Sequence, residues 1–193
     1  ACAPYRRLSL CNKNMVKMET TKITDKNDLL ADVCLAANHE GQSIKTHLEQ
    51  YDLKYPSGSG HTTCTALARS FADIGDIVRG RDLYRGNKKE NKQRKQLDDS
   101  LKEIFENIKE SDSKLTKLND DQIREYWWAL NRKEVWKAMT CSDDDNKLKD
   151  ASYFRATCSD GKNQYQTQKQ CRCDKEKAGK GSGDGDVNIV PTC

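Results

Sequence analysis

Nine cysteines and three histidines are the side chains with which this chain could hold a metal ion or attack a substrate. Cys171 and Cys173 form a C-x-C pair, and no two cysteines have C-x-x-C spacing. A structural zinc site needs further soft ligands at finger-like spacing, but the histidines lie far away in the sequence, at His39, His47 and His61. The pattern therefore favours disulfides over a metal site and an oxidising compartment over the cytosol. An odd cysteine count leaves at least one unpaired or bonded outside this chain.

The sequence motifs give little support for an enzyme. His61 lies close to Cys64, the one pairing that could activate a thiol nucleophile, but in an oxidising compartment Cys64 is better read as half of a disulfide. The chain has no G-x-S-x-G elbow, P-loop, H-E-x-x-H helix or dinucleotide-binding glycine motif. We therefore expect neither a hydrolase nor a redox enzyme, and no cofactor.

Positive charge is concentrated in residues 79–95, RGRDLYRGNKKENKQRK, which carry eight cations and two anions, whereas the whole chain is only +4. Such a run focuses positive potential locally and can hold sulfates through charge-assisted hydrogen bonds. Three lysines recur every three or four residues, so one helical face could present them together. The open alternative is a solvated charged helix that binds nothing. The candidate anion-binding residues are Arg81, Arg85, Lys88, Lys89, Lys92, Arg94 and Lys95.

A second, weaker basic patch falls in the low-complexity Lys/Gly/Asp tract of residues 175–186. Its candidate residues are Lys175, Lys177 and Lys180. Nucleic acid would feel the same fields, but a domain outside the cell rarely meets it, so we expect no nucleic-acid partner.

The sequence predicts that the segments carrying the cysteines and the basic run are mainly helical. The 193 residues fit one domain, and a mean hydropathy of −0.97 with only 3 prolines and 11 glycines argues against a turn-rich β-sandwich. Apolar spacing predicts helices over about 28–51, with a possible break at Gly41, and from a Thr62–Thr63 cap to about Gly80. A third should run through residues 97–108, after the basic run.

A fourth helix should begin at Asn119, where Gln122 three residues later completes a capping box. Its apolar stripe is predicted to contain Ile123, Trp127, Leu130, Ala138 and Cys141. The three tryptophans of this region predict a helix buried on two sides. Gly75, within the second helix, predicts close packing of a neighbour, because glycine otherwise costs a helix about 1 kcal/mol relative to alanine.

Several blocks of sequence resemble the Duffy-binding-like adhesion domains, and more closely their alpha class, from the variant erythrocyte membrane protein 1 family of malaria parasites. The blocks follow in order along the chain: CAPYRRLSLC, LLADVCLAANHEG, ARSFADIGDIVRGRDLYRG, REYWWALNRKEVWKAMTC, YFRATC and QCRC. DIGDIVRG followed downstream by a Trp pair is the most specific combination. The resemblance runs from end to end.

The resemblance implies an all-α, disulfide-braced helical bundle with an irregular N-terminal subdomain and long loops. Residues 1–60 would form the first subdomain and lead helix, and residues 61–193 the helical-bundle subdomain. The third subdomain of such domains is expected to be absent, because the chain stops at Cys193, where an aromatic usually follows Pro-Thr. We expect the chain to be an excerpt of a longer exported protein.

The function implied by the resemblance is adhesion to host cells, in cytoadherence and rosetting, with antigenic variation. The implied partners are red-cell surface glycans or glycoproteins, heparan-sulfate-like polysaccharide and host antibodies. The implied location is the outer face of the infected red cell, reached through a distant membrane anchor. The alternative is a structural spacer between other binding domains, with no receptor of its own.

Both the apolar stripes and the family pattern predict a Cys64–Cys141 disulfide, joining the start of one helix to the end of another. Cys34, Cys158, Cys171 and Cys173 are expected to pair among themselves, with the connectivity open. In the family, Cys2 and Cys11 tend to pair with cysteines upstream; here they are expected to stay unpaired or to pair with each other. The partner of Cys193 is left open.

Overall fold

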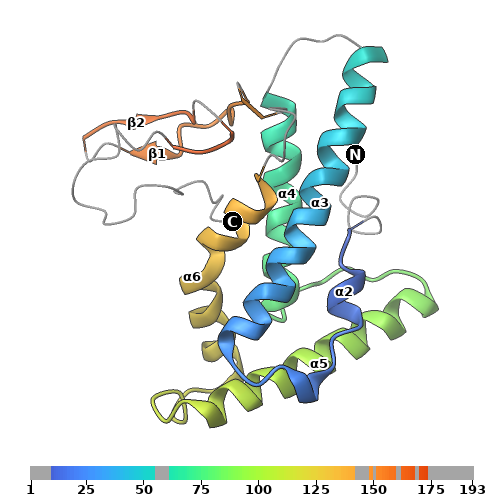
Figure 1. Ribbon diagram of the computed structural model, residues 1–193, viewed down its shortest axis with the longest axis vertical. Helices are drawn as coiled ribbons and strands as arrows, with labels where there is room; N and C mark the ends of the chain where they lie inside the picture. The colour runs from blue at the N-terminus through green and yellow to red at the C-terminus, as the bar shows by residue number, and fades with distance from the viewer. Residues whose placement is uncertain are drawn as a thin grey trace.

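The computed structural model describes residues 10–54, 61–141, 148–149, 151–159, 162–167 and 170–173. This part of the chain is mostly helical (Figure 1), which confirms the predicted all-α, disulfide-braced class. The elements are α2 (Lys13–Val16), the 3-10 turn η1 (Thr20–Lys22), α3 (Lys26–Lys54), α4 (His61–Val78), α5 (Lys88–Ser111), α6 (Asp120–Met139) and the short antiparallel pair β1 (Cys158–Ser159) and β2 (Gln164–Tyr165).

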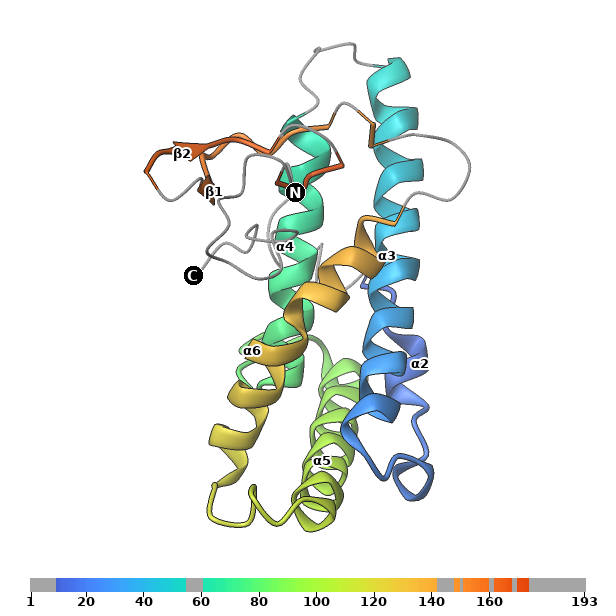
Figure 2. The same cartoon turned by 60° about the vertical axis from the view of Figure 1, so that its left-hand side comes forward.

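Helices α3, α4 and α6 pack together, with α5 across their lower end (Figures 1 and 2). Helices α3 and α6 run in the same direction: Trp127 Nε1 donates to the Lys26 carbonyl at 3.2 Å, and Lys45 Nζ to the Cys141 carbonyl at 2.5 Å. Helix α3 continues through Gly41 without the predicted break. A side chain at Gly41 would collide with the Met139 carbonyl, so this glycine serves close helix packing.

The centre of the core is aromatic. Phe71 of α4 lies 5.1 Å from Trp128 and 5.2 Å from Trp136 between ring centroids. The tryptophans of α6 are buried, as predicted, and a Cβ at Gly75 would lie 2.7 Å from the Trp128 ring, which confirms the predicted close approach. Leu130, by contrast, is 57% exposed, so its predicted place on the buried stripe is wrong. Ile123 and Trp127 of the predicted stripe are buried, and Trp128 and Trp136 add to the buried side of α6.

The described helix starts refine the sequence prediction. Asn119 caps α6 in the expected box with Gln122, and an unpredicted box joins Asn87 to Glu90 at the start of α5. Helix α4 begins at His61, so Thr62 and Thr63 lie inside its first turn rather than before it. Helix α5 buries one apolar face against the bundle, made of Leu97, Leu101, Ile104, Phe105 and Ile108.

The disulfides correct the sequence prediction. Cys64 bonds to Cys171, 107 residues away, and not to Cys141. Helix α6 ends at Met139, so Cys141 lies beyond the helix whose apolar stripe predicted the pairing. The Cys141 side chain is exposed, and its carbonyl accepts a hydrogen bond from Lys45 of α3. The chain that follows α6 returns to α4 instead and brings Cys171 to Cys64. A hydrogen bond from Trp136 Nε1 to the Cys171 carbonyl, at 3.3 Å, fixes this position.

Cys158 bonds to Cys173, which confirms part of the expected pairing among the later cysteines. The same expectation is wrong for Cys171, which bonds to Cys64, and for Cys34, which is in neither disulfide of the described residues. Cys11 is in neither disulfide as well. Cys2 and Cys193 lie outside the described residues. The subdomain boundary near residue 60 stays a prediction. None of the described helices combines the length and apolar character that a membrane crossing requires.

Candidate functional site

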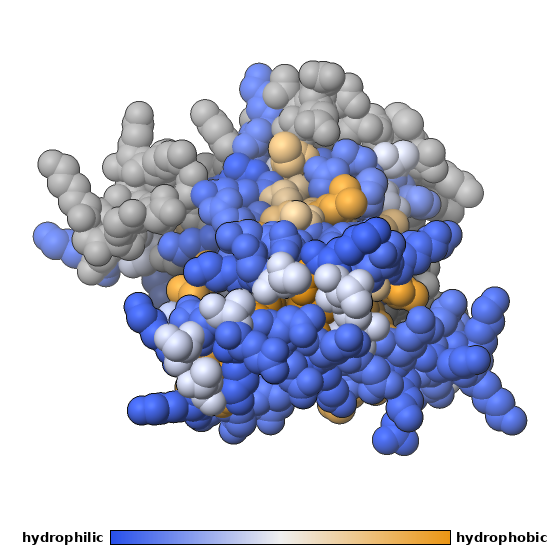
Figure 3. Space-filling view, turned by 60° about the horizontal axis from the view of Figure 1, so that its bottom comes forward, coloured by the Kyte–Doolittle hydropathy of each residue, from blue (hydrophilic) through white to orange (hydrophobic). Residues whose placement is uncertain are grey.

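The predicted anion-binding residues come from two neighbouring elements, the loop of residues 79–87 and the first two turns of α5. We call this set the basic surface: Arg81, Arg85, Lys88, Lys89, Lys92, Arg94 and Lys95. Figure 3 looks at the molecule with its lower end, where α5 lies, turned forward, and shows a face dominated by hydrophilic residues. The structure thus brings the seven cations into one region. Lys175, Lys177 and Lys180 lie outside the described residues.

Local backbone chemistry explains the change from helix to loop to helix. Gly80 has φ +72°, a left-handed conformation that ends α4 and that glycine adopts without strain. Asn87 then starts α5 by accepting hydrogen bonds from the Lys89 and Glu90 amides, each at 3.0 Å. These amides are therefore occupied, so an anion at this helix start would be held by side chains.

The arginines of the region are mostly committed to neighbouring elements. Arg81 Nε lies 2.9 Å from Glu125 Oε1 on α6. Arg94 Nε lies 3.7 Å from Asp82 Oδ2, and Arg94 also donates to the Tyr84 carbonyl. Arg79, outside the basic surface, pairs with Asp76 at 2.7 Å. These planar, multidentate groups hold the loop against α4, α5 and α6.

Arg85 and the four lysines differ from the arginines above. Among the described residues, none of the five takes part in an ion pair, and all are exposed. The helical register confirms that Lys88, Lys92 and Lys95 follow one another along α5. Their charge is available to a ligand because no carboxylate neutralises it within salt-bridge distance.

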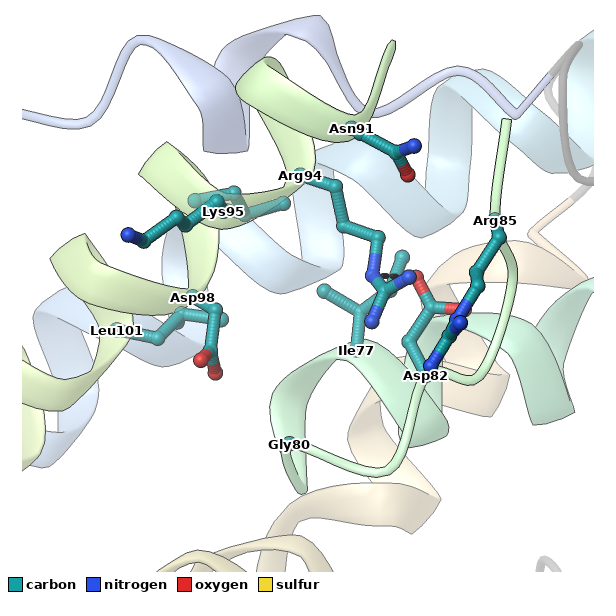
Figure 4. A pocket seen from close by; sticks show the side chains of 10 residues that line it. Ile77, Gly80, Asp82, Arg85, Asn91, Arg94, Lys95, Asp98 and Leu101 are labelled. Atoms are coloured by element: carbon teal, nitrogen blue, oxygen red, sulfur yellow. Dashed lines mark ion pairs between the residues drawn. The ribbon is translucent and has the colours of Figure 1, made fainter. Parts of the chain in front are cut away.

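A pocket opens between the loop and α5, beside the basic surface (Figure 4). Its volume is about 410 Å³. In the close-up, Arg94 extends from α5 toward Asp82 and Arg85 of the loop, while Lys95 and Asp98 lie farther along α5. The remaining lining residues are Ile77, Gly80, Asn91, Leu97 and Leu101. The pocket therefore combines charged walls with an apolar floor.

A buried arginine lies behind this pocket. Arg124 is 1% exposed, and its Nη1 donates to Asp98 Oδ1 at 3.3 Å and to the Val78 carbonyl at 3.4 Å. Lys102 Nζ lies 2.9 Å from Asp98 Oδ2, and this carboxylate raises the pKa of Lys102 through a hydrogen bond and charge attraction. Asp98 thus pairs with two cations, and it belongs to the framework of the pocket.

Burial also affects charges on the α4–α6 side of the loop. It lowers the pKa of Arg132, and the neighbouring charge of Arg79 lowers it further. Burial raises the pKa of Asp76, against the lowering effect of Arg79. Both groups lie beside Arg79 and not beside the unpaired lysines.

The sequence did not identify the acidic partners Glu125, Asp82 and Asp98, nor the buried Arg124. A helical-wheel signal existed for Arg124, which lies next to Ile123 and one turn before Trp127 and Trp128. The carboxylates gave no local signal, since their partners are set by packing. No group of three metal-ligating side chains occurs in the part of the chain that the structure describes.

Comparisons with known proteins agree with this architecture. A family model described as the Duffy binding domain matches residues 1–192. The chain is similar to the crystal structure of the NTS-DBL1(alpha-1) domain of Plasmodium falciparum membrane protein 1 (PfEMP1) from the varO strain. The identity is 34% and the TM-score 0.68, over 86% of this chain and 36% of that chain. No curated protein sequence matches.

A second similar structure is the N-terminal NTS-DBL1-alpha and CIDR-gamma double domain of PfEMP1 from the same strain. The identity is again 34%, with a TM-score of 0.67, over 86% of this chain and 23% of that chain. The chain thus spans about a third or less of the length of these solved chains.

Proposed function

This chain belongs to the Duffy binding domain family, and from that premise we propose that it is an extracellular, non-enzymatic adhesion module that binds sulfated glycans on host cells. The ligand is a heparan-sulfate-like polysaccharide on red-cell or other host surfaces. Binding serves cytoadherence and rosetting as part of a larger, membrane-anchored surface protein. That exposed position also makes host antibodies a partner and antigenic variation an expected property.

One observation carries the proposal: four lysines and an arginine, all exposed and unpaired among the described residues, lie together at the start of α5. A charged surface that serves only solubility normally intersperses both signs. Here the nearby carboxylates pair with Arg81 and Arg94, whereas Arg85 and the four lysines keep their positive charges without an ion pair. A flexible, multiply sulfated chain is the extracellular partner that matches several separate point charges.

The mechanism is association by charge. Lysine ammonium groups are compact, hydrated point charges on flexible stems, and they can each follow a different sulfate. Each exposed contact contributes on the order of 0.5 kcal/mol, and salt screens it. The binding is therefore additive over several lysines and weakens steeply as ionic strength rises.

Binding of the oxidised chain to intact red cells tests this function. Cells are used untreated, after heparinase treatment, or after protease treatment. We expect binding that heparinase removes. Binding lost only after protease would assign a protein receptor and contradict the glycan proposal. Absence of binding to any cells would favour the alternative, a structural spacer without its own receptor.

A further inference from the structure

We propose that the pocket between the loop and α5 holds one sulfated sugar residue, so that recognition adds a specific subsite to the general attraction of the lysines. This inference rests on the proposed function, since it names the ligand unit that one part of the same surface selects. It concerns Arg85, Lys95 and Asn91, whereas Lys88 and Lys89 lie outside the pocket lining.

The first argument is the balance of charge around the pocket. Asp82 is paired with Arg94, while Asp98 and Asp120 face Arg124 and Lys102. These groups cancel: three carboxylates meet three cations. Arg85 and Lys95 then remain, with no ion pair among the described residues. The pocket lining thus keeps two cations without an ion pair, Arg85 on the loop and Lys95 on α5. Lys95 extends away from Arg85 (Figure 4), and its flexible stem lets the ammonium turn toward a sulfate bound beside Arg85.

The second argument is the buried guanidinium behind the wall. Arg124 Nη2 makes no hydrogen bond to the described residues although the side chain is almost fully buried. A Cβ at Gly80 would lie 2.9 Å from Arg124 Nη1, so the glycine keeps the wall thin at this point. Asp98 and Asp120 offset the charge of Arg124, so this guanidinium contributes by fixing Asp98 in the pocket wall and not as a further cation.

The third argument is the chemistry of the remaining lining. Ile77, Leu97 and Leu101 provide an apolar floor, which matches the C–H face of a sugar ring. Asn91 Nδ2 donates to the Gly86 carbonyl at 3.0 Å, which fixes the amide and leaves its Oδ1 as an acceptor for a sugar hydroxyl. A volume of about 410 Å³ lies at the small end of ligand pockets, about 300–1,000 Å³. One substituted ring fits this space better than a long chain.

Glucosamine 6-sulfate is the probe, with unsulfated glucosamine as its control. In an NMR titration of the isotope-labelled chain, we expect the sulfated sugar to shift the Arg85 Nε–H and the Asn91 and Lys95 amide signals, and glucosamine to shift them far less. Arg85→Gln and Lys95→Gln should each weaken this binding about tenfold, the effect of one charge-assisted hydrogen bond. The control, Lys114→Gln with Lys117→Gln, changes two exposed lysines outside the basic surface and should leave it unchanged.

The outcome separates the two proposals. Retention of the chain on immobilised heparin together with no sulfate-dependent shift at the pocket would overturn the subsite and leave the general glycan function standing. Equal losses in the pocket variants and the Lys114/Lys117 control would also overturn it, since the sugar would then follow charge alone. Arg85 and Lys95 are exposed and take part in no ion pair of the described residues, so unchanged circular dichroism should accompany each variant.

Discussion

The packed layer of α3, α4 and α6 and the basic surface beside it use polar groups in opposite ways. In the layer, the buried carboxylate of Glu40 has fixed partners: it accepts from the Ser70 hydroxyl at 2.6 Å and from the Cys11 amide at 2.9 Å. On the basic surface, Arg85 and four lysines extend into solvent without an ion-pair partner among the described residues.

The difference shows where binding can be separated from stability. Arginines of the region belong largely to the framework, because Arg94 of α5 pairs with Asp82 of the loop and Arg81 of the loop pairs with Glu125 of α6. The lysines contribute little to that framework. Substitutions in the layer should therefore change the free energy of unfolding, and substitutions of the lysines should change only association.

The largest effect should follow removal of the Cys64–Cys171 disulfide. The bond closes a separation of 107 residues, so Cys64→Ser with Cys171→Ser should lower the unfolding free energy by about 4–5 kcal/mol in the chain-entropy model. Chemical denaturation of the oxidised variants measures this loss. As a matched control, Cys158→Ser with Cys173→Ser opens a separation of only 15 residues and should cost about 3 kcal/mol. A smaller loss for the long loop than for the short one would contradict the role of this brace.

Two aromatic residues of α6 provide the next test. Trp136 is fully buried and packs on Phe71, and Trp136→Ala should cost about 3–5 kcal/mol. Tyr126 is 53% exposed on the same helix, and Tyr126→Ala should stay within about 0.5 kcal/mol. Thermal and urea unfolding distinguish them. Similar losses for the two variants would show that α6 does not bury the face described here.

On the basic surface, substitutions of Arg81 and Arg85 should distinguish a side chain that stabilises the fold from one that contacts the ligand. Arg81→Gln removes the ion pair with Glu125 and should cost up to about 1 kcal/mol of stability, with little change in heparin affinity. Arg85→Gln should leave the unfolding midpoint unchanged and weaken heparin binding. The reverse assignment, with Arg81 dominating the affinity, would break the distinction between paired and unpaired cations.

The smallest effect concerns Cys34, whose thiol lies half-buried on α3. Burial and the nearby Glu134 charge raise its pKa to about 11. Because the reactive thiolate then accounts for about one molecule in a thousand at mildly alkaline pH, native Cys34 should react slowly with iodoacetamide, and faster as pH rises toward that value. Mass spectrometry of the labelled chain, with the urea-unfolded chain as reference, measures the rate. Equal rates in the native and unfolded chains would contradict the burial.

Sequence patterns predicted the elements that obey local rules. The Asn119 capping box, the tryptophan-rich helix and the close approach at Gly75 each follow from residues near one another in the chain. The basic run was equally visible, and its placement at the start of α5 follows from helical register.

Features set by tertiary packing could not be read in the same way. Cys64 meets Cys171 because the chain returns over α4 after α6, a path that no periodicity encodes. Glu125 pairs with Arg81 and Asp98 pairs with Arg124 only because the helices pack as they do. The number of cations could therefore be read from the sequence, but not which of them would lack an ion pair.

Retention on immobilised heparin tests the central claim most directly. Lys88, Lys89, Lys92 and Lys95 are changed together to alanine, and a control chain loses the same charge at the exposed residues Lys26, Lys114, Lys117 and Lys149. Four contacts of on the order of 0.5 kcal/mol each predict about a thirtyfold loss of affinity. We expect elution at clearly lower salt for the first variant, unchanged unfolding midpoints, and near-parental elution for the control. Equal elution of the two variants would show that net charge, and not the lysines of α5, holds the glycan, and would contradict the account.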